Sequence, residues 1–107
     1  MPDASLEFLA PAGFEWDEDK SKANRQKHGI DFEDATRIFY GPVLLRRSAR
    51  NDEERWIAIG SLENKLIAVV FTRRAEVIRI ISSRRARKNE ERTYRHTQLG
   101  RPPQGQD

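Results

Sequence analysis

The segment Leu66–Phe71 is apolar at every one of its positions and constrains the fold more than any other part of this chain. Its length and its content of Ile and Val are typical of a β-strand. A strand that is apolar on both of its sides must lie in a sheet whose two faces are both covered. A chain of 107 residues has room for one domain with a modest core, so the covering elements must be few.

Three further strands are predicted around this segment. Trp56–Ser61 and Val77–Ser82 flank Leu66–Thr72 across short turn-forming links, which indicates an antiparallel meander. Val43–Leu45 begins another strand, and the charged residues Arg46–Glu54 are expected to form a loop after it. We therefore predict a sheet of about four strands.

Two helices are predicted before these strands. Asp17 is a suitable N-cap for a first helix that runs to His28 and ends at Gly29. This helix is very polar; its evident apolar contact is Ala23, and it should lie on the surface. The alternation of Phe14-Glu15-Trp16 before it predicts a short edge strand.

The second helix is predicted from Asp31, its cap, to the pair Gly41-Pro42. Its apolar positions fall on one helical face that should pack into the core, and they are Phe32, Ala35, Ile38 and Phe39. A third helix over Lys88–His96 is the remaining candidate to cover the opposite face of the sheet.

The predicted fold is an α+β domain with an antiparallel or mixed sheet, and it spans residues 14–96. Residues 1–13 contain two Pro and one Gly without a sustained period, so we expect an N-terminal extension there. Residues 97–107 are expected to form a disordered tail.

Composition excludes several classes of protein. The chain has no cysteine, so it has neither disulfides nor a thiolate zinc site, and its two histidines make a histidine-based metal site unexpected. Its longest apolar run is far shorter than the roughly 20 residues needed to cross a bilayer, and its first residues lack the order of a signal peptide. We expect a cytoplasmic protein with no metal and no cofactor.

Charge is distributed unevenly along the chain. The net charge is +3, yet residues 1–34 contain nine acidic and four basic residues, while residues 73–95 contain nine basic and three acidic ones. A polyanion such as RNA would be attracted to the second segment. A solvated helix face is the alternative that charge alone leaves open.

The end of the last predicted strand carries the residues best suited to a phosphate group. In that strand Arg79 is expected on the face opposite Ile78 and Ile80. An arginine inside a strand is costly unless it meets an anion or water, so Arg79 either binds phosphate or forms a structural ion pair with Glu54 or another carboxylate. Further side chains can converge on a phosphate where the strand ends: Ser82, Arg84 and Arg85.

Three residues elsewhere have two possible roles each. Arg55 either joins the basic residues or pairs with the neighbouring acids Asp52–Glu54. His28, in the last turn of the first helix, is either a structural cap or a general acid, because the helix dipole favours its cationic form. Tyr94 in the last helix is either a core residue with its hydroxyl at the rim or a proton donor.

The chain resembles the BrnT family of toxins from BrnT/BrnA toxin–antitoxin systems in three ordered segments: FEWDEDKSKANRQKHGIDFEDATRIFYGP, ERWIAIG and IRIISSRRARKNEERTYRH. The positions that match the family pattern are Trp16, Lys27, His28, Gly29, Phe32, Arg55, Gly60, Arg79, Ser82, Arg84, Arg85, Glu90, Arg92 and Tyr94. The resemblance implies a RelE-like fold, endoribonuclease activity on messenger RNA and inhibition of translation. It also implies neutralisation by an adjacent BrnA antitoxin, through which the pair binds operator DNA.

Metal-free RNA cleavage uses the ribose 2′-hydroxyl as its nucleophile, so the protein must remove that proton, stabilise a charged phosphorane and protonate the 5′-oxygen. Arginines suit the second task, because their planar groups bind phosphate oxygens in pairs. We assign Arg79, Arg84 and Arg85 to it, with His28 and Tyr94 as the first candidates for proton transfer and Lys27 as the next choice. RNA binding outside the centre is assigned to Arg55, Lys27, Ser82, Arg87, Lys88 and Arg92.

Two other functions fit the same basic residues. A non-catalytic nucleic-acid-binding module would use them to hold phosphates for positioning alone. An interaction protein would use them to dock an acidic antitoxin.

Overall fold

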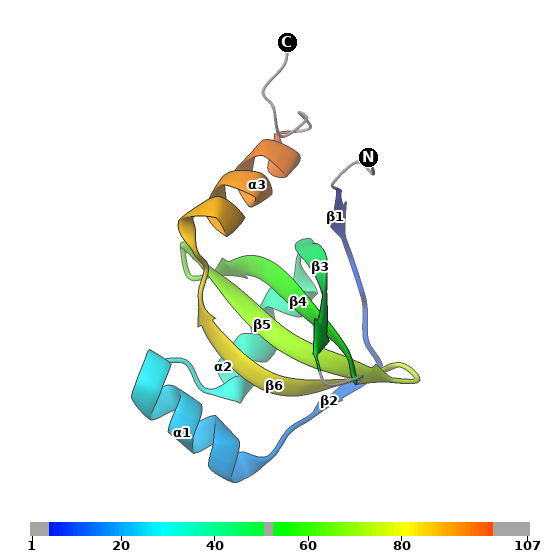
Figure 1. The fold of residues 1–107 in the computed structure, drawn as a ribbon, viewed down its shortest axis with the longest axis vertical. Helices are drawn as coiled ribbons and strands as arrows, with labels where there is room; N and C mark the ends of the chain where they lie inside the picture. Colours follow the sequence, from blue (N-terminus) through cyan, green and yellow to red (C-terminus); the bar gives the residue numbers. More distant parts are fainter. Residues whose placement is uncertain (1–4, 51–52, 100–107) are drawn as a thin grey trace.

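The computed structural model describes residues 5–50 and 53–99 of the chain. Within these ranges the strands are β1 (Leu6–Glu7), β2 (Gly13–Glu15), β3 (Val43–Arg50), β4 (Glu53–Leu62), β5 (Lys65–Arg74) and β6 (Val77–Arg85). The helices are α1 (Glu18–His28), α2 (Phe32–Ala35), the 3₁₀ helix η1 (Thr36–Tyr40) and α3 (Lys88–Gln98). Figure 1 shows a strongly curled sheet with α1 and α2 along one side and α3 following the end of β6.

The strands form one mixed sheet in the order β1-β3-β4-β5-β6-β2. The predicted antiparallel meander is confirmed by β3 to β6, and β2 is the predicted short strand, which joins β6 in parallel. The prediction of about four strands is wrong, because the described residues form six. β1 pairs with β3 although it lies in the segment expected to be an extension, and its two residues are too few to show a period.

The segment Arg46–Glu54 is mostly strand, which corrects its prediction as a loop. Arg47 pairs across the strands with Trp56, and its guanidinium lies 5.2 Å from the centroid of the ring. The same guanidinium forms an ion pair of 2.6 Å with Glu54. Long charged side chains can cover apolar surface with their stems, so a charged composition does not exclude a strand.

Both faces of the sheet are covered, as the apolar middle strand predicts. On β5, Ile67, Val69 and Phe71 point into a larger core, while Leu66 and Ala68 point into a smaller core. α2 and η1 cover the larger core with Phe32, Ala35, Ile38 and Phe39. α3 covers the smaller core through Tyr94, so the predicted role of the last helix is confirmed.

α1 begins and ends at the predicted residues. The Oδ1 atom of Asp17 accepts hydrogen bonds from the backbone N–H groups of Asp19 and Lys20, at 2.9 and 3.2 Å. Gly29 ends the helix with φ of 76°, a left-handed conformation that glycine adopts without steric cost.

α1 packs on the sheet through polar side chains, so the prediction of an apolar contact at Ala23 is wrong: Ala23 is exposed. Ser21 is buried and accepts a hydrogen bond of 2.9 Å from the backbone N–H of Phe32. Asn24 is buried as well; its amide donates to the carbonyl of Ser83 at 3.0 Å, and its Oδ1 accepts from the N–H of Ser83 at 3.2 Å. Hydrophobic periodicity does not detect a helix that is attached by hydrogen bonds.

The second predicted helix is α-helical for one turn only and then continues as the 3₁₀ helix η1. Its start is as predicted, because Oδ1 of Asp31 accepts a hydrogen bond of 2.7 Å from the N–H of Asp34. η1 lies directly against β4 at Gly60, where an added Cβ would be 2.8 Å from the Cβ of Ile38. Glycine at this position therefore permits the close approach of η1 to the sheet.

Candidate functional site

The pairing of β6 with β5 shifts by one residue at Ile81, which lies between the partners of Phe71 and Val70. Such a bulge adds an unpaired residue and changes which later side chains face each side of the sheet. Ser83 therefore points to the same side as Ile80, where it is fully buried. The simple alternation of a strand does not continue past this point.

Arg79 and Arg84 lie on opposite sides of the bulge but point to the same face of the sheet. Arg79 alternates with the core residues Ile78 and Ile80, so its predicted orientation is confirmed. Arg84 pairs with Ala68, which belongs to the smaller core. The shared face is the one that carries α3.

Two arginines on neighbouring strands point to this face too. Ile57 on β4 packs against the smaller core, so its side chain lies on the same face as α3. Arg46 is the cross-strand partner of Ile57, and Arg55 lies two residues before it on β4, so both arginines point to this face as well. Arg46 was not predicted as a site residue, because its segment was expected to be a loop. We call these residues the arginine face, which consists of Arg46, Arg55, Arg79 and Arg84.

Arg79 faces a carboxylate that the sequence prediction did not name. Its Nη1 lies 3.6 Å from Oε2 of Glu15, and Nη1 of Arg74 lies 3.7 Å from the same oxygen. The predicted alternative partner, Glu54, pairs with Arg47 instead. The side chain of Arg79 is 38% exposed, so a ligand can reach it.

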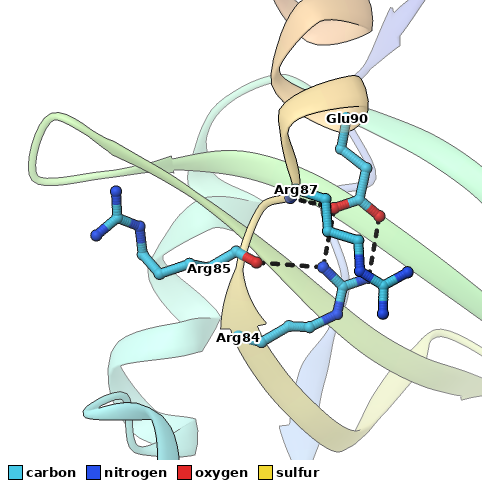
Figure 2. Close-up of polar contacts among 4 residues, drawn as sticks. All are labelled: Arg84, Arg85, Arg87 and Glu90. Carbon is cyan, nitrogen blue, oxygen red and sulfur yellow. Dashed lines mark hydrogen bonds and ion pairs between the residues drawn. The ribbon is translucent and has the colours of Figure 1, made fainter.

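Arg84 is held by Glu90 in a two-point ion pair (Figure 2). Its two terminal nitrogens each donate a hydrogen bond of 2.9 Å to a different oxygen of the Glu90 carboxylate. Oε1 of Glu90 also accepts a bond of 2.8 Å from the backbone N–H of Arg87, which is the N-cap of α3. The two side chains are 20% and 4% exposed, so the pair joins the end of β6 to the start of α3 in a largely covered position.

This ion pair shifts the pKa values of both partners. The hydrogen bond to Glu90 raises the pKa of Arg84, although burial opposes it. Burial acts against the charged form of Glu90, but the hydrogen bonds from Arg84 and Arg87 and their charges hold its pKa below the ordinary value. Both groups are therefore charged at neutral pH.

Arg85 turns away from Arg84, as Figure 2 shows, and the structure thus divides the predicted arginine group between two faces. Arg85 lines a hollow of about 210 Å³ together with His28, Lys65, Asp34 and other residues. This hollow lies beside the end of α1, on the side of Ile67 and the larger core. His28 and Arg85 are therefore brought together with each other, but not with Arg79.

Tyr94 is a core residue, 3% exposed, in the smaller core. Its hydroxyl lies 3.5 Å from the carbonyl oxygen of Pro42, which is a long hydrogen bond. Burial raises the pKa of Tyr94, so its hydroxyl is protonated at neutral pH.

The other predicted RNA-binding residues differ in how exposed their side chains are. Ser82 is half-buried and pairs with Val70, on the face of Arg79. Four other predicted RNA-binding residues are exposed, and they are Arg87 and Lys88 at the start of α3, Arg92 within α3 and Lys27 on α1.

Neither a metal cluster nor a membrane helix is found in the described part of the chain. Residues 5–50 and 53–99 contain no group of three or more His, Cys, Asp or Glu side chains placed to hold a metal ion. None of the helices in these ranges has the length and apolar character required to span a membrane.

A family comparison bears directly on this site. The profile of the ribonuclease toxin BrnT, of type II toxin–antitoxin systems, matches residues 16–90. The chain belongs to the BrnT family. The matched range includes all four residues of the arginine face and Glu90, and membership implies an antitoxin partner for this BrnT toxin. No curated protein matches the chain.

Proposed function

We propose that this BrnT toxin is a RelE-like endoribonuclease that cleaves messenger RNA without a metal ion and so arrests translation. A BrnA-like antitoxin encoded by an adjacent gene would neutralise it, and the toxin would reach operator DNA only through that antitoxin. Because translation takes place in the cytoplasm, the toxin would act there.

The observation that carries this proposal is the arginine face within a chain of the ribonuclease toxin family. Arg55 and Arg79 come from β4 and β6, which flank β5, and point to the same side of the sheet. Cleavage through the 2′-hydroxyl builds negative charge on the phosphorus centre, and fixed guanidinium groups stabilise such charge without reorganising. We place the scissile phosphate at Arg79, which is half-exposed, with Arg55 as an outer contact.

The remaining arginines have supporting roles in this proposal. Arg84 fixes the junction of β6 and α3 through Glu90, so it positions the face more than it binds phosphate itself. Ser82 and the exposed cations of α3, Arg87, Lys88 and Arg92, would hold flanking nucleotides.

The hollow with His28 and Arg85 faces the other side of the sheet. Its cations, together with Lys27 on α1, would contact RNA that passes around the end of β6. We assign no step of the cleavage reaction to this hollow.

The test is incubation of the purified toxin with end-labelled RNA in excess chelator. We expect fragments that end in a 2′,3′-cyclic phosphate, because the 2′-oxygen attacks the adjacent phosphorus. A mobility shift without fragments would support a non-catalytic binding module instead. Fragments that appear only after Mg²⁺ is added would contradict the metal-independent mechanism.

A further inference from the structure

Glu15 is a carboxylate on the same face as Arg79, and it has no role in the reaction proposed above. β2 pairs in parallel with β6, and the register places Phe14 opposite Ile78 and Glu15 opposite Arg79. Phe14 packs against the larger core, so Glu15, the next residue, points to the face of Arg79. The alternation of Phe14-Glu15-Trp16 in the sequence is the signal that could have indicated this orientation.

The Oε2 atom of Glu15 is buried, and it has no hydrogen-bond partner among the described residues. The nearest cations are Nη1 of Arg79 and Nη1 of Arg74, at 3.6 and 3.7 Å, which is beyond hydrogen-bonding distance. A buried polar atom without a partner costs free energy, so native structures rarely retain one. The Glu15 side chain as a whole is 37% exposed, so its carboxylate can accept a hydrogen bond from a ligand that reaches Arg79.

We propose that Glu15 is the general base of the reaction and accepts the proton of the ribose 2′-hydroxyl. This inference rests on the proposed ribonuclease function and deepens it. A phosphate bound at Arg79 brings with it the 2′-hydroxyl of the preceding ribose, and a base must lie within hydrogen-bonding reach of that group. Oε2 of Glu15 lies beside the guanidinium that holds the phosphate.

The other candidates for proton transfer are less well placed. His28 lines the hollow on the opposite side of the sheet. Tyr94 is buried in the smaller core, and burial keeps its hydroxyl protonated, so it does not accept a proton. Charged groups that face Glu15 are Arg79 from β6 and Arg74 from β5, with Arg55 farther across the same face.

The 2′-O–H bond breaks and its proton passes to the carboxylate of Glu15, while the 2′-oxygen forms a bond to phosphorus. The bond from phosphorus to the 5′-oxygen breaks, and the 5′-oxygen takes a proton from solvent and leaves as a hydroxyl. The products are a 2′,3′-cyclic phosphate and a 5′-hydroxyl end.

The experiment measures kcat/KM for cleavage of a labelled RNA by the full-length toxin against pH, for wild type, Glu15→Gln and Glu54→Gln. Glu54 is the matched control, since it too forms an ion pair with an arginine but lies on the face of Trp56, away from Arg79. We expect Glu15→Gln to lower the rate about 100-fold or more and to remove the fall in rate at acid pH. Glu54→Gln should match wild type.

Two further measurements separate catalysis from structure. Affinity for the same RNA with a 2′-O-methyl group at the scissile site should change less than threefold in Glu15→Gln. Formate, a small carboxylate, should restore part of the activity of Glu15→Ala, whether or not Glu15→Gln is well folded.

The outcomes distinguish the two proposals. No cleavage by wild type overturns the ribonuclease proposal and this one with it. If wild type cleaves RNA but Glu15→Gln keeps the same rate, or keeps the same fall in rate at acid pH, only the role of Glu15 is overturned. A loss of RNA affinity that equals the loss of rate, with no rescue by formate, shows a structural ion pair and also overturns it.

Discussion

Arg79 and Arg84 lie on one face of one strand, yet their neighbours give them different roles. Arg84 is mostly covered and bonded at two points to the buried carboxylate of Glu90. Arg79 is more exposed and meets Glu15 only at ion-pair distance. A buried pair that loses one partner leaves an uncompensated charge, whereas an exposed pair contributes little to stability.

Replacement of Arg84 by Ala should therefore lower the free energy of unfolding by roughly 3 kcal/mol, because Glu90 would stay buried without its partner. Arg79→Ala should cost less than about 1 kcal/mol. Urea unfolding followed by circular dichroism gives both values. Equal losses for the two variants would contradict this division of roles.

At the scale of elements, α1 and α3 are attached in different ways. α3 buries the aromatic ring of Tyr94 and is fixed at its start by Glu90. α1 is attached by Ser21 and Asn24, whose hydrogen bonds reach the start of α2 and β6. The stability of α1 thus depends on a few hydrogen bonds more than on apolar area.

The substitution Asn24→Ala should destabilise the protein by roughly 2–3 kcal/mol, since it leaves the N–H of Ser83 and the carbonyl of Ile30 buried without this partner. Ala23→Ser, at the exposed neighbour, is the control and should cost less than about 0.5 kcal/mol. Thermal unfolding of the two variants compares them. A cost below that of the control would show that Asn24 does not hold α1.

The attachment of α3 should depend on pH. The pKa of Glu90 is lower in the folded protein than in the unfolded chain, where it is about 4.3. The stability that this carboxylate contributes is present above that value and is lost as the pH falls through the folded pKa, because the unfolded state binds more protons. The difference in unfolding free energy between wild type and Glu90→Gln should therefore be largest near pH 7 and shrink below about pH 4. A difference that is constant with pH would contradict this.

Much of the fold could be predicted from local pattern, and the site only in part. The apolar run Leu66–Phe71 indicated two covered faces, and the caps at Asp17 and Gly29 gave the ends of α1. The bulge at Ile81 depends on the partner strand, so the face of Arg85 could not be predicted from alternation. Glu15 meets Arg79 only because β2 and β6 pair in parallel across a long stretch of chain.

At the scale of the whole molecule, the helices cover the two faces of the sheet unequally. α1, α2 and η1 follow one face, while α3 packs mainly against β4 and β1 on the other. The part of that second face with Arg46, Arg55 and Arg79 is exposed or half-exposed. A polyanion would thus meet several cations on one face of the sheet.

The central claim is that this face cuts RNA through the 2′-hydroxyl and that Arg79 stabilises the charge. The most direct test compares wild type and Arg79→Ala on a labelled RNA, in excess chelator, with a 2′-O-methyl RNA of the same sequence as the control substrate. We predict that wild type yields fragments with 2′,3′-cyclic phosphate ends from the unmodified RNA alone. Arg79→Ala, folded as shown by circular dichroism, should cleave about 100-fold more slowly or worse. Full cleavage by Arg79→Ala, or cleavage of the 2′-O-methyl RNA by wild type, would contradict the claim.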